Sequence, residues 1–368
     1  MTTIENPSEQ RLGIVLDYSN DGSDAAGDLA MEESRARTAE IDAFRIDALS
    51  GLAQQQRSIP SKYLYDAVGA KLFEDITRQP EYYPTRTEIE LLKKHAGEIA
   101  EEVGPGATIV EPGSGAGEKV EILLQAMRSL RAMVPMDIAR EQLRRVSRTL
   151  SARHPGLQIV PLWADFTRAI DVPDEVAKLH PRLVFFPGST IGNFLPPVQR
   201  QLLASLAHLA GSDGSLLIGF DRIKEESTLI PAYDDAAGVT RDFEMNILHR
   251  LRRELDAKAS PEHFRYEARW NDTHARIEMH LVATDPTSIE IDGQRFEFAP
   301  GETLWNESSY KYDMPRIEAL ADSAGLHVAR TWSDSKDWFT IALLKAGSRP
   351  AQGRRLKNDN LASRPPIG

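Results

Sequence analysis

The sequence predicts an α/β protein in which a mostly parallel sheet is joined to a second, antiparallel region. Three observations support this prediction. Apolar strands alternate with helices from residue 108 to residue 220, as a parallel sheet requires. Strict two-residue alternation replaces that pattern at 264–281, and this is typical of antiparallel strands. The α/β pattern returns from residue 314, so the antiparallel region is predicted to be an insert.

Composition limits the classes of function. The chain has 368 residues, enough for two domains, and its 55 acidic against 44 basic residues give a formal charge of −11. This charge argues against nucleic-acid binding, and the lack of cysteine excludes disulfides and thiolate chemistry. No stretch approaches the roughly 20 apolar residues that span a bilayer, and the N-terminus lacks a signal-peptide pattern. We therefore expect a cytoplasmic protein that contacts neither nucleic acid nor membrane.

Both ends of the chain are expected to be disordered. Residues 1–36 are polar and acidic, and residues 348–368 are rich in Pro, Arg and Ser. A helical pattern begins near residue 37, and a tyrosine-rich stretch ends at Tyr82-Tyr83-Pro84, in a predicted loop before a helix at 88–100. Such tyrosines can simply cover a core, but loops on a rigid scaffold are also where ligand contacts concentrate.

A glycine-rich turn follows the first strand of the predicted sheet. Residues 108–119 form an apolar strand, three glycines and the start of a helix. Gly113, Gly115 and Gly117 would let the backbone approach a ligand closely at the carboxyl end of the strand. Because glycine-rich turns also occur where nothing binds, an ordinary strand-to-helix turn remains an alternative.

The next three strands are also followed by polar residues. These strands are predicted at 132–137, 157–163 and 182–187, and a further strand at 215–220 completes the run. Asp137 lies about twenty residues beyond the glycines, where a carboxylate can bind both ribose hydroxyls of an adenosine. Asp165 can take the adenine amine while Phe166 packs on the ring, and Asn193 follows the next strand. Each aspartate alone could be a helix N-cap, but together they favour an adenosine-containing cofactor at this edge.

The glycine spacing indicates which cofactor. In a dinucleotide-binding Gly-x-Gly-x-x-Gly pattern counted from Gly113, the third glycine would fall on Glu118, whose carboxylate would repel a pyrophosphate. Lys119 lacks the glycine spacing and the following Ser or Thr of a phosphate-binding Walker loop. S-adenosylmethionine has no phosphate and carries a cationic sulfonium, so it fits an acidic edge better than a nicotinamide cofactor does.

The region after residue 222 contains the insert. Two hairpins are predicted, one turning at Asn271-Asp272 and one at Asp292-Gly293, a type I′ signal. A helix at 314–324 and strands at 327–332 and 338–345 follow. Such a closing antiparallel pair is common in cofactor-dependent methyl-transfer domains.

Several long motifs, in order, carry a family resemblance. They are Tyr65-Asp-Ala-Val-Gly69, Pro80-Glu-Tyr-Tyr-Pro-Thr-Arg-Thr-Glu88, Gly188-Ser-Thr-Ile-Gly-Asn193, Ala232-Tyr-Asp-Asp-Ala-Ala-Gly-Val-Thr240, Arg276-Ile-Glu-Met279 and Glu307-Ser-Ser309. Together they resemble the histidine-specific Nα-methyltransferases of ergothioneine biosynthesis, which form hercynine. The resemblance covers roughly residues 40–345 and includes neither end of the chain.

The resemblance implies a Rossmann-like S-adenosylmethionine-dependent methyltransferase sheet with a second α+β substrate-binding domain inserted in it and preceding it. The methyltransferase domain would comprise 86–222 and 311–347, and the substrate-binding domain 38–85 and 223–310. The implied enzyme is a cytoplasmic monomer of the methyltransferase class (EC 2.1.1) that uses no metal. Its substrate, L-histidine, would lie between the domains.

The resemblance also implies roles for individual residues. The substrate carboxylate would be held by Asn193, Tyr82 and Tyr233, and the imidazole by Glu307 and Ser309. The pocket near the amine would be completed by Tyr65, Phe73, Gly188, Thr240 and Met279, and the catalytic residues would be Tyr65, Tyr82 and Asn193. The cofactor positions would be Gly113, Gly115, Lys119, Asp137, Asp165 and Phe166. Pro112 departs from the aliphatic residue expected there, but it only tightens the turn.

The chemistry can be argued without the resemblance. A sulfonium is already activated, so the protein mainly has to align sulfur, methyl and nitrogen, and such orientation can lower a barrier by about 7 to 11 kcal/mol. The amine must arrive neutral, and a dry pocket beside a cation favours loss of its proton. The nine histidines show no metal-ligand spacing, and no dedicated base is evident. Glu307 can accept the imidazole N–H, although it and Ser309 could merely cap a turn.

The leading hypothesis is therefore an enzyme that methylates the α-amine of L-histidine three times, consuming three S-adenosylmethionines. One alternative is the same reaction on tryptophan or tyrosine, although an apolar residue would then be expected in place of Glu307. The other is a non-catalytic, cofactor-binding regulatory protein.

Overall fold

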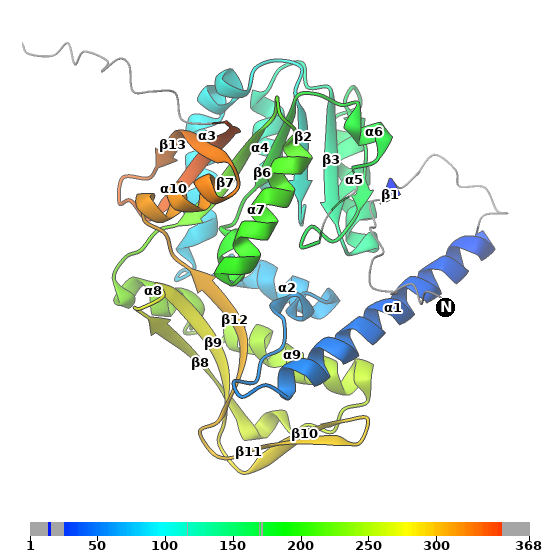
Figure 1. Cartoon of the computed structure of the whole chain (residues 1–368), viewed down its shortest axis with the longest axis vertical. Coiled ribbons are helices and arrows are strands. Elements are labelled where there is room, and N and C mark those ends of the chain that lie inside the picture. The colour runs from blue at the N-terminus through cyan, green and yellow to red at the C-terminus, as the bar shows by residue number, and fades with distance from the viewer. Residues whose placement is uncertain (1–13, 16–25, 116, 169, 171, 348–368) are drawn as a thin grey trace, which may run out of the picture.

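A nine-stranded mixed sheet forms the larger part of the protein in a computed structural model, which describes residues 14–15, 26–115, 117–168, 170 and 172–347 (Figure 1). Along its main path the strands run in the order β1-β5-β3-β2-β6-β7-β14-β13, with β4 beside β3. The strands are β1 (Ile14–Val15), β2 (Thr108–Pro112), β3 (Ala132–Asp137), β4 (Gln158–Ile159), β5 (Leu162–Trp163), β6 (Arg182–Phe186), β7 (Ser215–Asp221), β13 (Leu326–Ser333) and β14 (Phe339–Ala346).

The central strands of this sheet are parallel and fully buried. β2 pairs in parallel with β3 and β6, β3 with β4 and β5, and β6 with β7, while β14 returns antiparallel beside β7. Every residue of β2, β6 and β7 is buried. Such near-continuous apolar strands need helices on both faces.

Two groups of helices provide that cover. One face packs against α3 (Tyr83–Val103), α4 (Glu118–Ala126) and α5 (Arg140–Arg153). The other packs against α6 (Asp174–Ala177), α7 (Pro196–Ala210) and α10 (Met314–Ser323). The apolar residues of these helices recur at helical spacing, so each helix buries one stripe against the sheet.

The remaining elements form a second, smaller core. β8 (Phe264–Asn271), β9 (Arg276–Ala283) and β12 (Thr303–Tyr310) make a three-stranded antiparallel sheet, and β10 (Thr287–Ile291) pairs with β11 (Gln294–Phe298). The helices of this part are α1 (Ala26–Leu52), α2 (Ala67–Ile76), α8 (Glu226–Tyr233) and α9 (Val239–Leu255). Short 3-10 turns occur here at η1 (Ser61–Leu64) and η3 (Pro261–His263), whereas Ile191 of a third, η2 (Thr190–Asn193), belongs to the core of the larger sheet. A single apolar cluster unites α1, α2 and α9 with strands of both antiparallel sheets.

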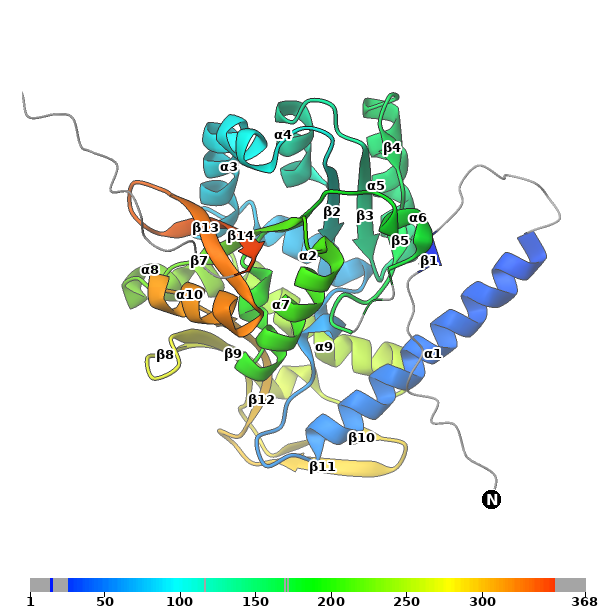
Figure 2. The ribbon, with the colours of Figure 1, turned by 45° about the horizontal axis from the view of Figure 1, so that its top comes forward.

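The two parts meet through β12, which runs from the smaller sheet towards the larger one (Figures 1 and 2). The contact with η2 is close: a Cβ added to Gly192 would lie 2.8 Å from the Tyr310 carbonyl oxygen. A larger residue at this position would push η2 away from β12. The segment that ends in Asn193 is therefore fixed directly against the strand that carries Glu307.

The structure confirms the α/β class, the parallel sheet and the antiparallel insert. Asp292 and Gly293 have φ angles of 50° and 78°, as the predicted type I′ turn requires. The strand predicted at 157–163 is instead two short strands, because Pro161 has no N–H with which to continue the ladder. The division into two domains stays a prediction, and its boundary at residue 85 falls inside α3.

Two helix starts also differ from expectation. The helix expected at 88–100 begins at Tyr83, so Tyr82 is its N-cap rather than part of a loop, and Pro84 occupies the first turn where its missing N–H is harmless. α1 begins at Ala26, inside the lead expected to be disordered. Apart from Ile14–Val15, the earlier part of that lead and the tail at 348–368 lie outside the described residues.

Candidate active site

The glycine turn lies at the carboxyl end of β2, as predicted, and is held by backbone hydrogen bonds. The Gly113 and Ser114 amides both donate to the Met136 carbonyl, at 2.8 and 3.1 Å. Gly113 has a φ of 70°, and a Cβ there would lie 3.4 Å from the Phe166 ring. Only glycine combines this conformation with an open space beside the aromatic ring. The turn therefore forms a cradle with Phe166 as one wall.

The two predicted aspartates lie around this cradle. Asp137 accepts hydrogen bonds from the Gly115 and Ala139 amides, and burial raises its pKa despite those bonds. Asp165 accepts from the Thr167 amide at 2.9 Å and its hydroxyl at 2.5 Å. In neither case does the aspartate cap a helix, because α5 has Ala139 as its N-cap and α6 has Pro173. The N-cap alternative for the two aspartates is thus wrong.

Lys119 and Gly188 meet at a carboxylate that the sequence analysis missed. Glu88 is buried in α3; it accepts from Lys119 Nζ at 2.6 Å and from the Gly188 amide at 2.9 Å. A second missed acid, Glu111, is buried in β2, and burial raises its pKa well above the ordinary value although Lys119 opposes this. Within the described residues Glu111 Oε2 has no hydrogen-bond partner. The cradle thus carries two buried carboxyl groups besides Asp137.

Aromatic rings line the other side of the site. Tyr65 contacts Phe73 at a centroid distance of 5.5 Å, Phe73 contacts Tyr82 at 6.4 Å, and Tyr82 contacts Tyr233 at 6.1 Å. Phe243 of α9, which was not predicted as a site residue, packs on both Tyr65 and Phe73. The predicted tyrosines therefore come together from separate segments of the chain.

Glu307 of β12 lies at the centre of this group. Its Oε1 atom is 3.2 Å from Asn193 Nδ2, and its carboxyl also accepts hydrogen bonds from Ser61 and Tyr65. Burial raises the pKa of Glu307 to about 8, against the effect of these bonds and of the Lys311 charge. Glu244, buried in α9, has its pKa raised by burial and by Glu307. The carboxyl group of Glu307 is thus mostly neutral at pH 7.

Ser309, two residues along β12, belongs to a second polar network. Its hydroxyl is 2.8 Å from Tyr233 Oη, and Lys311 Nζ lies 2.6 Å from Tyr233 Oη. Lys311 and Lys224 both pair with Asp221 at the end of β7, at 2.7 and 2.5 Å. Burial alone would raise the pKa of Asp221, but the two ammonium groups together hold it below its usual value.

Comparisons with known proteins show the family of this chain. A family profile described as "Histidine-specific methyltransferase, SAM-dependent" matches residues 44–346. This chain belongs to that family. The histidine N-alpha-methyltransferase of Mycolicibacterium smegmatis is 38% identical over 86% of this chain and 98% of its own length. That of Mycobacterium tuberculosis is 38% identical over 82% and 94%. A 4-dimethylallyltryptophan N-methyltransferase of Claviceps purpurea is 27% identical over 80% and 92%.

The protein is therefore an S-adenosylmethionine-dependent, histidine-specific methyltransferase by family. Its sequence-predicted residues lie in two adjoining groups. Gly113, Gly115, Asp137 and Phe166 surround the glycine cradle, Lys119 joins Gly188 through Glu88, and Asp165 directly precedes Phe166. The second group contains Tyr65, Phe73, Tyr82, Asn193, Tyr233, Glu307 and Ser309. Met279 is buried opposite Glu307 in the β9–β12 ladder, and Thr240 is buried near the start of α9.

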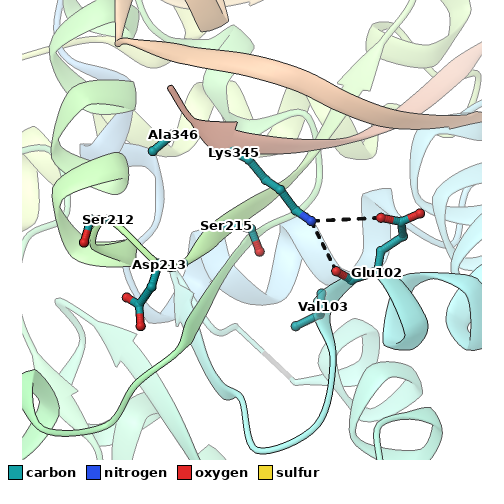
Figure 3. Close-up of a pocket in the computed structure, with 8 residues that line it drawn as sticks. Glu102, Val103, Ser212, Asp213, Ser215, Lys345 and Ala346 are labelled. Atoms are coloured by element: carbon teal, nitrogen blue, oxygen red, sulfur yellow. Dashed lines mark hydrogen bonds and ion pairs between the residues drawn. The ribbon is translucent and has the colours of Figure 1, made fainter. Parts of the chain in front are cut away.

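The methyltransferase has a further hollow far from these residues. It is bordered by the end of α3, the turn before β7 and the end of β14, at the amino end of the parallel strands (Figure 3). Lys345 Nζ lies 3.3 Å from the Glu102 carbonyl there. None of the predicted site residues lines this hollow. Ligands of open parallel sheets bind at the opposite, carboxyl edge, where the two groups lie.

The described residues contain no group of three or more His, Asp or Glu side chains placed to hold a metal ion. The helices among them are too short or too polar to cross a membrane.

Proposed function

We propose that this methyltransferase transfers methyl groups from S-adenosylmethionine to the α-amine of L-histidine until three are attached, forming hercynine for ergothioneine synthesis. The observation that carries the proposal is the buried placement of Glu307 and Ser309 on one strand, opposite Tyr82, Tyr233 and Asn193. This arrangement offers polar partners to an imidazole on one side and to a carboxylate on the other. We further propose that the enzyme is a cytoplasmic monomer.

The glycine cradle suits S-adenosylmethionine by the chemistry of its donors. Asp137 would bind the ribose hydroxyls, Asp165 the adenine amine, and Phe166 the face of the ring, while Gly113 and Gly115 allow close approach. Lys119 would hold the carboxylate of the methionine moiety. Glu88 supports that role because it fixes Lys119 Nζ at 2.6 Å. S-adenosylmethionine supplies an electrophilic methyl group on a cationic sulfur.

The substrate would lie between the cradle and β12. Asn193, Tyr82 and Tyr233 would bind its carboxylate, and Glu307 and Ser309 its ring. In the proposed complex Asn193 Nδ2 gives up its 3.2 Å contact with Glu307 and turns to the substrate carboxylate. Tyr65, Phe73, Thr240, Met279 and Gly188 would enclose the amine.

The residues would act mainly by orientation and exclusion of water. Two anchoring points, at the carboxylate and at the ring, fix the direction of the amine lone pair, and such alignment can supply about 7 to 11 kcal/mol. The aromatic wall of Tyr65, Phe73 and Tyr82 limits hydration and so favours the neutral amine. A neutral Glu307 carboxyl can share its proton with the imidazole, so the ring is bound without an unpaired buried charge.

A mass-spectrometric assay tests the reaction. The enzyme incubated with L-histidine and S-adenosylmethionine should yield products heavier by one, two and three methyl groups. With L-tryptophan or L-tyrosine in place of histidine, no methylated product should form. Methylation of tryptophan or tyrosine instead would establish the alternative substrate class. Binding of S-adenosylhomocysteine without any methyl transfer would point to a regulatory protein.

Glu307→Gln tests the ring site. The variant keeps the size of the side chain but cannot share a proton. The imidazole therefore loses its proton-sharing partner, and kcat/KM for histidine should fall about a hundredfold. The matched control is Asp137→Asn, which should weaken S-adenosylhomocysteine binding in calorimetry and leave the preference for histidine unchanged. An unchanged histidine preference in Glu307→Gln would show that the ring binds elsewhere.

A further inference from the structure

Lys311 directly follows β12 and is fully buried, and none of the roles proposed above uses it. Its amine lies 2.7 Å from Asp221 Oδ2, 2.6 Å from Tyr233 Oη and 2.7 Å from Ser309 Oγ. An ammonium group has three N–H donors and no acceptor. Lys311 therefore gives one hydrogen to the carboxylate and one to each hydroxyl oxygen.

The two hydroxyls also contact each other, with 2.8 Å between Tyr233 Oη and Ser309 Oγ. Each hydroxyl has one hydrogen and two acceptor positions, and Lys311 occupies one of those positions on each oxygen. One hydroxyl hydrogen then lies between the two oxygens, and the other points away. The pair has two states: Tyr233 donates to Ser309, or Ser309 donates to Tyr233.

In the proposed complex, the substrate selects one of these states. A carboxylate that accepts the Tyr233 hydrogen forces Ser309 to donate to Tyr233. Lys311 already fills one acceptor position of Ser309, so the other is left for a ring N–H. Without the carboxylate, Tyr233 is able to donate to Ser309, and the ring then meets a donor.

We propose that Lys311 is a positioning residue that couples recognition of the substrate carboxylate at Tyr233 to recognition of the ring N–H at Ser309. This inference rests on the proposed function, because it takes the two binding points from there. The local charge supports it: Lys224 and Lys311 share the single carboxylate of Asp221. Two amines thus lie beside one carboxylate, next to the Tyr233 hydroxyl at which the substrate carboxylate is proposed to bind, although burial lowers the pKa of Lys311 and lowers that of Lys224 to about 8.

The test compares Lys311→Met with Lys224→Met. Lys224 pairs with the same Asp221, at 2.5 Å, but its other contacts are Tyr83 Oη and the Arg222 carbonyl, so it is a matched control. Enzyme saturated with S-adenosylhomocysteine is titrated with L-histidine, histamine, which lacks the carboxylate, and L-phenylalanine, which lacks the ring N–H. Two ratios are measured: the Kd of histamine over that of histidine, and the Kd of phenylalanine over that of histidine.

Both ratios should fall about tenfold in Lys311→Met, because each hydroxyl regains an acceptor position and the coupling is lost. Both should stay within twofold of wild type in Lys224→Met. If either ratio in Lys311→Met stays within twofold of wild type while S-adenosylhomocysteine binding is intact, the proposal is wrong.

Ser309→Ala gives a second test that leaves Lys311 in place and remains informative if Lys311→Met does not fold. Removing the ring-side hydroxyl breaks the chain between the two binding points, so the ratio for histamine should fall although the carboxylate site is untouched. An unchanged ratio for histamine would overturn the coupling. Wild-type enzyme that does not bind histidine at all would instead refute the proposed function, and this inference with it.

Discussion

The two sides of the site are built in different ways. The glycine turn of the cradle is held by its backbone amides, with the Gly113 and Ser114 amides on one carbonyl and the Gly115 amide on Asp137, although the buried carboxyls of Glu88 and Glu111 lie beside it. The side formed by β12 is held by side chains, many of them ionisable and buried, among them Glu307, Lys311 and Asp221. Backbone bonds cost little to bury once paired, whereas buried charges depend on every partner. Substitutions at the glycine turn should therefore act mainly on affinity, and substitutions at the β12 side on stability as well.

The largest effect is expected from Asp221→Ala. This change leaves Lys224 and Lys311 buried without their carboxylate, which should destabilise the protein by about 3 to 5 kcal/mol in chemical denaturation. The control is Arg45→Ala, which breaks a surface pair with Asp292 whose side chains are 31% and 47% exposed, and should cost about 0 to 1 kcal/mol. Equal losses in the two variants would show that the buried network contributes no more than a surface pair.

Glu307→Gln should change stability in the opposite direction, and only at higher pH. Burial raises the pKa of Glu307 from its ordinary 4.5 to about 8 in the folded protein. Below pH 4.5 the carboxyl is neutral in both states; as the pH rises towards 8, only the unfolded chain loses the proton, so the folded protein loses relative stability. The stability difference between variant and wild type should move in favour of the variant by about 2 to 4 kcal/mol between pH 4.5 and pH 8.

Denaturation curves across this pH range measure the shift, which also contains a contribution from Glu244 because the two carboxyls interact. The control is Glu302→Gln, just before β12, where the Ala299 amide and Arg57 lower the pKa. It should show no such gain with rising pH. A pH-independent difference in Glu307→Gln would mean that Glu307 ionises normally in the folded protein.

The smallest effect is expected at the cradle, from Gly113→Ala compared with Gly106→Ala. Both glycines have positive φ angles, 70° and 75°, so each alanine should cost about 1 kcal/mol in stability. A Cβ at Gly113 reaches the Phe166 ring at 3.4 Å, whereas one at Gly106 has no atom within 4 Å. Calorimetry should therefore show about tenfold weaker S-adenosylhomocysteine binding in Gly113→Ala only. Equal binding by both variants would place the cofactor away from this turn.

The features predicted best from the sequence are those that a local pattern of residues determines. The parallel strands, the antiparallel insert and the Asp292-Gly293 turn follow from periodicity and turn chemistry, and the structure confirms them. The membership of the family is confirmed as well, while the roles of the individual site residues stay predictions. Two errors were avoidable, since Pro84 in a first helical turn and Pro161 as a strand break are both recognisable signals.

Contacts between residues far apart in the chain could not be predicted from the sequence. The sequence correctly predicts a helix at Glu88. No local sequence pattern indicates that Glu88 contacts Lys119, 31 positions away. The pairing of Asp221 with Lys311 likewise depends on how β7 and the end of β12 come together. From the sequence alone, a lysine is expected at the surface. The burial of Lys311 could not be predicted, because it depends on partners from other elements.

In the proposed site, the side chains of β12 contact the ring that is particular to one amino acid, and other segments contact the carboxylate that all amino acids share. In the proposed site Glu307 and Ser309 contact the ring, with Met279 opposite Glu307 in the ladder, whereas Asn193 and Tyr82 contact the carboxylate from other segments. A change of substrate would then need replacements on one short stretch of ladder, with the methyl donor and the backbone of the substrate held as before. In the proposed site, β12 therefore determines which amino acid is accepted, and the other segments supply the parts needed to methylate any amino acid.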